Sequence, residues 1–396
     1  MNFAKRAKEI ESEIIESRHF LHKNAELSLK EYKTTAYLID ELKKAGIEVI
    51  SFDDYCGCIA VIRGSKPGNT VLLRADIDAL PITENSGVDF SSETEGVMHA
   101  CGHDCHTAML LAAAKMLNEN KDQIQGTVKC LFQSGEEVFI GSHYYWDKGY
   151  LSDVDAAMGL HVWNTIPAGT MSIKDGYLMA SCDNFHLTIK GKSAHGSTPQ
   201  LGHDAIVAAS AAILNIQSIV SRLSDPLDTL VVTVGKITAG KEFNIICDSA
   251  SMEGTIRAYN PAGRELAMQK VGEIAKQTAE VYGCTAEISF DEPELSVCNR
   301  DTKLNDLARN SAVKLFGENA LAETRSATGS EDFSYIMDKI PSSLFIFLGY
   351  YDEEQGCIYP AHNEKFKINE SILPVGAAQY AQFAVDYLDA SAGGES

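Results

Sequence analysis

The stretch TVLLRADID at residues 70–78 decides the fold class, because a mainly apolar run ends in two acids, Asp76 and Asp78. A short apolar run bounded by polar residues is typical of a strand that is covered on both faces. Three further runs have this character, at 127–132 (TVKCLF), 156–160 (AAMGL) and 344–348 (LFIFL). An apolar helix is expected at 107–117, between the first two runs. Strands that alternate with helices predict an α/β domain with a helix-flanked, largely parallel sheet.

The N-terminal flank of this stretch is helical. Phe3, Ala7, Ile10 and Ile14 recur at helical spacing, so an amphipathic helix is expected to open the chain. A second helix is expected over 34–45, before a glycine that is typical of a helix end.

The middle of the chain follows a different pattern. Phe185, Leu187 and Ile189 alternate with polar residues, as in a half-buried strand. Helices are then expected over 204–220 and 263–282, and strands over 229–236, 249–258 and 285–290. The order β-α-β-β-α-β is that of a ferredoxin-like α+β domain. We therefore predict that residues 183–296 form an α+β domain inserted into a larger α/β domain, which comprises 1–182 and 297–396.

Composition argues against several classes of partner. The 396 residues carry a formal net charge of −21, so neither nucleic acid nor an anionic membrane is expected as a partner. No stretch is expected to reach the roughly 20 apolar residues of a membrane helix, and the N-terminus lacks a secretory signal pattern. The ten cysteines are scattered and are expected to be reduced thiols. These features favour a cytoplasmic protein.

Residues that can bind a metal ion follow each predicted strand of the larger domain. They are Asp76 and Asp78 after the first, Glu136 and Glu137 after the second, His161 after the third and His362 beyond the fourth. A denser group, HACGHDCH at 99–106, precedes the apolar helix. Ligands collect beyond the carboxyl ends of strands in such sheets, and unpaired buried carboxylates are costly. His161 or Cys101 alone would be more typical of a packed side chain, but the conjunction favours a metal site.

The adjacent acids Glu136 and Glu137 suggest a division of roles. Neighbouring side chains on an extended segment point in opposite directions. One carboxylate can then bind metal while the other faces the attacking water as general base. A solvated loop is the alternative, and it is less expected directly after a buried strand.

Eight segments of the chain resemble a known enzyme family. They are LRADIDALPI (73–82), HACGHDCHTAMLLAAA (99–114), FQSGEE (132–137), the His161 segment, SAHGSTP (193–199), GTIRAYNP (254–261), GSEDFS (329–334) and AHNEKF (361–366). They are similar to motifs of the aminoacylase and glutamate-carboxypeptidase family of metallopeptidases. The resemblance is greatest to its amidohydrolase branch, which includes hippurate hydrolases, auxin-conjugate hydrolases and N-acetyl-diaminopimelate deacetylases.

The resemblance implies a zinc-peptidase-like catalytic domain, with 183–296 as a lid domain through which two copies of the chain form a homodimer. It implies two divalent metal ions per subunit, of Zn, Mn, Co or Ni. The metal ligands that it implies are Cys101, His103, Glu137, His161 and His362. By the same correspondence, Glu136 is the general base.

The resemblance also implies roles for other acids. Asp78 matches an acid that orients a metal ligand in most of the family. Asp76 stands where most members have histidine, and in this branch it is treated as catalytic. The two acids are not ranked. Asp104 is expected to orient a ligand from the second layer of side chains.

Three residues of the lid domain take roles from the resemblance. The resemblance implies that His195 stabilises the oxyanion and that Asn244 and Arg257 hold the substrate carboxylate. Without the motifs, His195 would be interpreted as an exposed loop histidine and Arg257 as part of a strand-edge salt bridge.

The chain departs from the pattern of the branch in two places. Ser134-Gly135 replaces the usual Pro-Ala before the acid pair, and GSHYYW at 141–146 replaces a run of small residues. One hypothesis is that Tyr144, Tyr145 or Trp146 reshapes the acyl pocket. The alternative is that they serve helix packing.

The expected function is cleavage of the amide bond of a small N-acyl amino acid, such as an N-acetyl or N-benzoyl conjugate. A metal-activated water would attack with Glu136 as general base. One alternative is a metallo-dipeptidase or aminopeptidase, which acts on a free amine. Another is an N-acetyl-diaminopimelate deacetylase of lysine biosynthesis. A non-catalytic metal-binding protein is a third, and the intact pair Glu136-Glu137 argues against it.

Overall fold

The computed structural model describes residues 1–393, which fall into two compact units. Unit 1 comprises Met1–Leu178, Cys298–Arg325 and Asp332–Ser396, and unit 2 comprises Met179–Val297 and Ser326–Glu331. The predicted insert, 183–296, falls within unit 2. The segment Ser326–Glu331 joins unit 2 through backbone contacts, among them a hydrogen bond from Ala180 N to Gly329 O of 2.9 Å. No periodicity in the sequence indicates this attachment.

Unit 1 contains a seven-stranded sheet in the order β1-β2-β4-β3-β5-β13-β6. Its central strands β4, β3, β5 and β13 are parallel, and β1, β2 and β6 add antiparallel edges. The strands are β1 (Glu48–Ser51), β2 (Gly57–Arg63), β3 (Lys66–Asp76), β4 (Gln125–Gln133), β5 (Ala156–Pro167), β6 (Met171–Ser172) and β13 (Ser343–Tyr351). The α/β prediction is confirmed. The four apolar runs predicted as strands are the four parallel ones.

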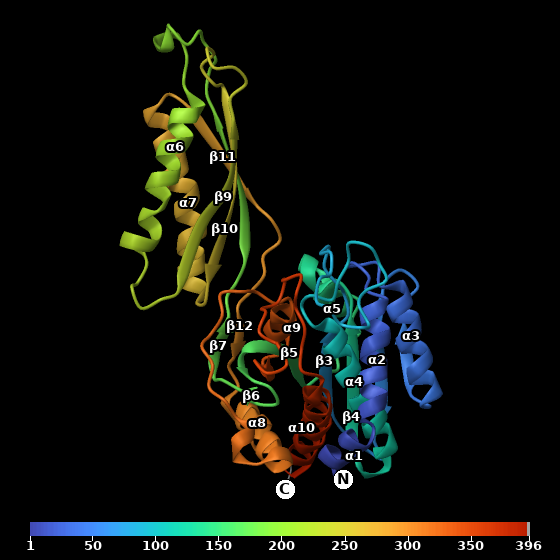
Figure 1. Cartoon of the computed structure of the whole chain (residues 1–396). Coiled ribbons are helices and arrows are strands. Elements are labelled where there is room, and N and C mark those ends of the chain that lie inside the picture. Colours follow the sequence, from blue (N-terminus) through green and yellow to red (C-terminus); the bar gives the residue numbers. More distant parts are fainter. Residues whose placement is uncertain (394–396) are drawn as a thin grey trace. The chain divides into compact units, whose positions relative to one another are not determined.

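The helices of unit 1 flank this sheet (Figure 1). They are α1 (Phe3–Glu9), α2 (Glu11–Lys23), α3 (Tyr32–Lys44), α4 (His103–Glu119), α5 (Gly141–Asp147), α8 (Thr302–Phe316), α9 (Phe333–Lys339) and α10 (Leu373–Gly393). Helix α4 is buried along most of its length and packs against α2 and α10. It begins at His103, four residues before the expected start, so part of the metal-binding motif lies in its first turn. The expected opening helix is divided at Ile10 into α1 and α2.

Unit 2 has an antiparallel four-stranded sheet in the order β11-β8-β10-β9, with α6 and α7 on one face (Figure 1). Its elements are β8 (Asp183–Lys190), α6 (Ala205–Ile216), β9 (Leu230–Ala239), β10 (Ser249–Ala258), α7 (Pro261–Val281) and β11 (Thr285–Phe290). The alternating Phe185, Leu187 and Ile189 face the core beneath the helices. The ferredoxin-like prediction is confirmed. Two short strands, β7 (Gly176–Met179) and β12 (Val297–Asn299), pair where the chain passes between the units.

The stretch Ala205–Leu223 of unit 2 is long and apolar enough, by length and composition alone, to cross a membrane. The expectation that no segment would reach this length is wrong here. Most residues of this stretch lie outside the core, because only 28% of its apolar part is buried. Helix α6 buries alanines against the sheet, while Ile206, Val207 and Leu214 are exposed.

Candidate active site

The five predicted metal ligands come together in unit 1. Cys101 Sγ lies 3.4 Å from His161 Nε2, and Glu137 Oε1 lies 3.9 Å from His103 Nε2 and 3.3 Å from His362 Nε2. Possible donor atoms of Cys101, His103 and His161 lie within 4.8 Å of one another, as do those of Cys101, Glu137 and His362. The segments that supply them are the loop before α4 and the start of that helix, the turn after β4, the middle of β5 and the loop after β13. His161 lies inside β5 and not beyond its end, because β5 continues to Pro167.

Two of these donor atoms support a metal-binding role directly. His103 Nε2 and Glu137 Oε1 are buried, and neither has a hydrogen-bond partner among the residues that the structure describes. Buried polar atoms are almost always hydrogen-bonded, so an orphaned pair that converges needs an explanation. A cation would satisfy both atoms. The donor set of thiol, imidazole and carboxylate groups suits a borderline transition metal.

The imidazoles of His161 and His103 are held so that one nitrogen is available. His161 Nδ1 donates to the carbonyl of Val162 at 2.7 Å, and burial lowers the pKa of His161 well below its usual range. The ring is therefore neutral and presents Nε2 as an acceptor. His103 Nδ1 lies 3.1 Å from Asp78 Oδ1, which leaves its Nε2 facing Glu137. Both histidines have the second hydrogen bond that fixes a metal-binding tautomer.

Asp78 contacts two parts of the candidate site. Besides His103, it accepts hydrogen bonds at Oδ2 from Ser28 Oγ (2.7 Å) and from the backbone N–H of Glu137 (3.0 Å). The side chain is fully buried. Its contacts fit the predicted role of orienting a metal ligand.

Asp76 has different partners. Its Oδ1 accepts a hydrogen bond from His106 Nδ1 at 2.6 Å, and its Oδ2 accepts one from Arg74 Nη1 at 2.7 Å. Burial opposes ionisation, but the charges of His103 and Arg74 and the hydrogen bond from His106 hold the pKa of Asp76 well below its usual range. The nearest approach of Asp76 Oδ2 to His103 Nε2 is 3.8 Å. Both oxygens are engaged in these structural bonds, and a catalytic role for Asp76 stays a prediction.

His106 was not singled out from the sequence, yet it connects two parts of the site. Its Nε2 accepts a hydrogen bond from Val162 N at 2.9 Å, and its Nδ1 donates to Asp76. Val162 follows His161, so His106 ties Asp76 to the backbone beside a predicted ligand. The signal that could have indicated this is its spacing of three residues from His103 in the first turn of α4.

The expectation that Asp104 orients a metal ligand is wrong in this structure. Asp104 Oδ2 accepts from Arg18 Nε and His22 Nδ1, each at 2.9 Å. Helix geometry turns Asp104 away from its neighbour His103 and toward α2. The charges of Arg18 and His22 hold the pKa of Asp104 well below its usual range, although burial opposes this.

The acid pair does not lie on an extended segment as expected. Gly135 has a left-handed φ of 75°, which ends the strand, and Glu136–Val138 forms a 3-10 turn. As a result, both carboxylates face the same histidine: Glu136 Oε2 and Glu137 Oε1 each lie 3.9 Å from His103 Nε2. The two acids can still divide their roles, with Glu137 adjoining His362 and Glu136 buried beside it.

Backbone strain is concentrated around this site. Within residues 1–393, the non-glycine residues with positive φ are Leu29 (63°), Phe139 (59°) and His362 (65°). His362 is a predicted ligand, Phe139 ends the turn that carries the acid pair, and Leu29 lies against Gly135. Such conformations are unfavourable by about 1–2 kcal/mol each and persist where function or packing imposes them.

The predicted lid residues lie on two parts of unit 2. His195 and Asn244 are exposed on neighbouring loops, joined by a hydrogen bond from Gly196 N to Asn244 O of 2.7 Å. His195 Nδ1 accepts from Ser197 N at 3.1 Å. Arg257 lies on β10, a central strand, and donates from Nη1 to Ser330 Oγ at 2.9 Å. The alternative interpretation of Arg257 as a strand-edge salt bridge is therefore wrong.

Two of the aromatic residues of α5, Tyr144 and Tyr145, have packing partners. Tyr144 stacks on Tyr55 with ring centroids 3.9 Å apart and donates to Asp54 at 2.5 Å. Tyr145 is fully buried and donates to the carbonyl of Cys56 at 3.0 Å. These contacts favour the helix-packing alternative over a direct role in an acyl pocket.

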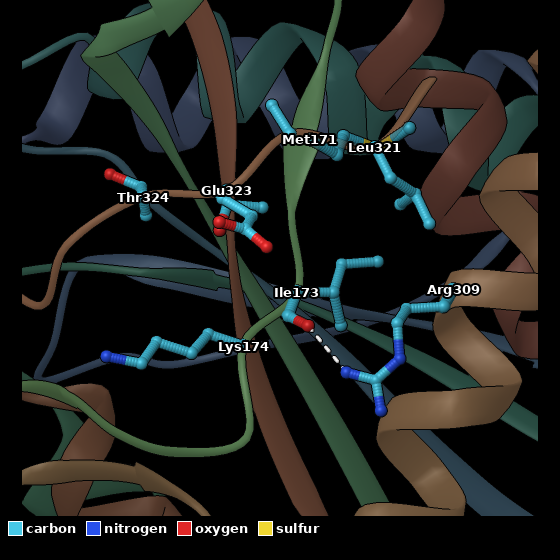
Figure 2. A pocket seen from close by; sticks show the side chains of 9 residues that line it. Met171, Ile173, Lys174, Arg309, Leu321, Glu323 and Thr324 are labelled. Carbon is cyan, nitrogen blue, oxygen red and sulfur yellow. Dashed lines mark hydrogen bonds between the residues drawn. The ribbon is translucent and has the colours of Figure 1, made fainter. Parts of the chain in front are cut away.

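A cavity of about 440 Å³ lies elsewhere in unit 1 and contains none of the predicted site residues (Figure 2). Its lining includes Met171, Leu321 and Arg309. The Arg309 guanidinium is engaged within the protein, since it donates to the Ile173 carbonyl (2.7 Å) and to Asp306 (2.8 Å). We assign no ligand to this cavity.

Comparison with known proteins agrees with the geometry. Residues 72–386 match the sequence profile of peptidase family M20/M25/M40. The chain is 38% identical over 387 residues to thermostable carboxypeptidase 2 of Saccharolobus solfataricus, covering 96% of each chain. It is 38% identical over 364 residues to N-acetyl-L-cysteine deacetylase of Bacillus subtilis, covering 92% of this chain and 85% of the relative. A crystal structure of a dinuclear metal-binding M20 peptidase from Bacillus subtilis superposes with a TM-score of 0.85 at 33% identity, covering 96% and 99% of the two chains.

Proposed function

The chain belongs to peptidase family M20/M25/M40 and is a metal-dependent hydrolase of amide or peptide bonds, and we propose that its substrates are N-acyl amino acids. The observation that supports a hydrolytic site is the convergence of five metal-binding side chains with one additional buried acid, Glu136. A site that only bound metal would not need the additional acid.

We propose that Cys101, His103, Glu137, His161 and His362 hold two divalent ions of Zn, Mn, Co or Ni. The orphaned His103 Nε2 and Glu137 Oε1 fit this assignment. A sulfur ligand disfavours Mg and Ca, which prefer oxygen. When bound, such ions supply Lewis acidity and lower the pKa of water toward neutrality.

Glu136 is the general base of the proposed reaction. It takes a proton from the attacking water and passes it to the nitrogen of the departing amino acid. Its carboxylate lies 3.9 Å from His103 Nε2, at the ligand cluster, and the proposal assigns it to proton transfer because five other side chains hold the ions. Asp78 supports this arrangement through the backbone N–H of Glu137.

The lid residues complete the proposal through their chemistry and the resemblance. Because His195 Nδ1 accepts a hydrogen bond, the proton of a neutral ring is on Nε2, which can donate to an oxyanion. Asn244 and Arg257 are assigned to the substrate carboxylate, for which a guanidinium offers two parallel donors.

The replacement Glu136→Gln tests the assignment of the base. Hydrolysis of N-acetyl and N-benzoyl amino acids should fall at least about 1,000-fold, because general-base catalysis is lost while the shape is kept. Metal content, measured by elemental analysis, should not change. Glu354→Gln, on an exposed loop, is the matched control and should behave as wild type. Substantial residual turnover in Glu136→Gln would refute the assignment.

A carboxypeptidase is the second candidate, because a relative of that name is as similar as the deacetylase. The two identities are equal, so they do not separate the two activities, and both activities release an amino acid with a free carboxylate. A panel of N-acetyl amino acids, N-blocked dipeptides, unblocked dipeptides and N-acetyl-diaminopimelate would do so. We expect the N-acyl amino acids to give the highest kcat/KM. A preference for blocked dipeptides would favour the carboxypeptidase.

We also propose that the chain forms a homodimer through unit 2. Helix α6 exposes Leu214 (73% exposed), Val207 and Ile206, and β9 is an edge strand that exposes Ile237. An apolar helix face beside an open sheet edge is typical of an interaction surface.

A further inference from the structure

The residues that precede the acid pair are hydrogen-bonded to two side chains from other elements, Glu31, which is 103 positions from Ser134, and Tyr145 of α5. Ser134 Oγ donates to Glu31 Oε2 at 2.7 Å, and Gly135 N donates to Glu31 Oε1 at 3.0 Å. Ser134 N donates to the Tyr145 hydroxyl at 3.0 Å, and this hydroxyl in turn donates to Cys56 O at 3.0 Å. Glu31, Ser134 and Tyr145 are fully buried. All the polar groups named here are therefore satisfied inside the protein.

We propose that Glu31, Ser134 and Tyr145 form a brace that positions the turn carrying Glu136 and Glu137. This inference rests on the proposed function, because it takes Glu136 as the base. The brace holds the residues that lead into the turn, and Asp78 holds the middle of the turn through Glu137 N. Between them lies Gly135 in a left-handed conformation, which can relax to many others if it is released. The three brace residues act through the turn and are positioning residues.

The brace connects the two places where the chain departs from the pattern of its branch. A proline at 134 would have neither the N–H that bonds Tyr145 nor the hydroxyl that bonds Glu31. A small residue at 145 would leave the buried N–H of Ser134 without its acceptor, which is costly. Ser134 and Tyr145 are therefore expected to depend on each other. This assigns Tyr145 a role in positioning the base and removes it from the acyl pocket.

Steady-state kinetics of Ser134→Ala and Tyr145→Phe, at saturating metal, test the brace. Each replacement should lower kcat about tenfold with KM within about twofold, because supporting hydrogen bonds typically have effects of this size. Ser142→Ala is the matched control. Ser142 is equally buried, and its hydroxyl has no hydrogen-bond partner among the described residues. The double variant of Ser134 and Tyr145 should lose less than the product of the single losses, because both support the same turn.

Affinity for Co²⁺, measured by competition with a chromophoric chelator, provides a readout without substrate. Ser134→Ala and Tyr145→Phe should weaken it about tenfold through Glu137, and Ser142→Ala should not change it. The proposal is overturned if both variants keep kcat and Co²⁺ affinity within twofold of wild type, or if Ser142→Ala loses as much as they do. Wild-type protein that hydrolyses no N-acyl amino acid would refute the proposed function alone, since the Co²⁺ comparison would still decide on the brace.

Discussion

Asp76 and Asp78 are two positions apart, yet they have different structural roles. Strand alternation would place both on the same face of the sheet. However, β3 ends at Asp76, so Asp78 lies beyond the strand and contacts His103 and Glu137. Asp76 instead joins Arg74 to His106. The acids therefore contribute to different properties of the protein.

Replacing each acid by asparagine separates these contributions. Asp78→Asn should weaken metal affinity about 10- to 100-fold, because the amide cannot accept at both positions. Asp76→Asn should instead lower the free energy of unfolding of the metal-free protein by about 3 kcal/mol, because it removes a buried charge partner of Arg74. Chelator competition measures the first effect and urea unfolding the second. Two variants with the same profile would contradict this division.

The structure brings the predicted metal ligands together, as it does the predicted supporting residue Asp78, but the partners of Asp104 were not predictable. Cys101, His103 and Glu137 lie in compact motifs whose chemistry is visible in the sequence. The partner of Asp104 is Arg18, 86 positions away on a helix that shows only a generic amphipathic pattern. A hydrogen bond between distant elements depends on side-chain directions that no local periodicity specifies.

At the scale of elements, hydrophobic patterns located strands and helices but not their ends. The run 156–160 marked β5, yet the strand extends past His161 because it pairs with β13. The acid pair lies on a 3-10 turn because Gly135 adopts a left-handed conformation. Tertiary pairing and single glycines decide such boundaries, and a window of apolar residues does not contain that information.

The loop after β3 is fastened to helix α2 by a charged pair, Glu84 and His22. His22 Nε2 lies 3.1 Å from Glu84 Oε1, and its Nδ1 faces Asp104. Burial alone would raise the pKa of Glu84, but the hydrogen bond and charge of His22 lower it to about 2. Although burial opposes it, the charge and hydrogen bond of Asp104 raise the pKa of His22. Each ring nitrogen faces a carboxylate oxygen, an arrangement that favours the protonated ring.

This pair predicts a pH-dependent stability. A carboxyl group whose pKa is lower in the folded protein stabilises the fold at pH values above its pKa in the unfolded chain, near 4.5. This contribution is lost as the pH falls toward 2. Glu84→Gln should therefore lower the free energy of unfolding by about 1–2 kcal/mol at pH 6, a figure discounted for partial solvent screening. At pH 3 the difference in the free energy of unfolding between wild type and Glu84→Gln should be clearly smaller. Urea unfolding with EDTA at each pH measures this difference, and Glu95→Gln is the control, because Glu95 is an exposed residue of the same loop. A difference that stays constant from pH 6 to pH 3 would exclude this account.

At the scale of the whole molecule, the alternation of patterns indicated an inserted α+β segment, and unit 2 contains it. The attachment of Ser326–Glu331 to unit 2 was not predictable, since six residues carry no periodicity and their bonding depends on the placement of β-bridges. The apolar character of α6 was visible in the sequence. Whether that character served the core could be decided only from burial, which shows four alanines and Ile216 inside and Ile206, Val207 and Leu214 outside.

The exposed face of α6 predicts a concentration-dependent homodimer. A glutamate in place of Leu214 would introduce a charge into an apolar contact. The new charges of the two copies would also repel each other, and each chain already has a net charge of −21. Sedimentation equilibrium should show wild-type dimer at micromolar concentration and at least about 30-fold weaker association for Leu214→Glu, equivalent to about 2 kcal/mol. Val281→Glu is the matched control, because Val281 is also exposed (79%) and apolar. It lies at the end of α7, which packs against β11, and β11 is the edge of the sheet opposite β9. Monomeric wild-type protein that instead cosediments with neutral lipid vesicles through Ala205–Leu223 would show that this apolar face binds lipid and not a second copy of the chain.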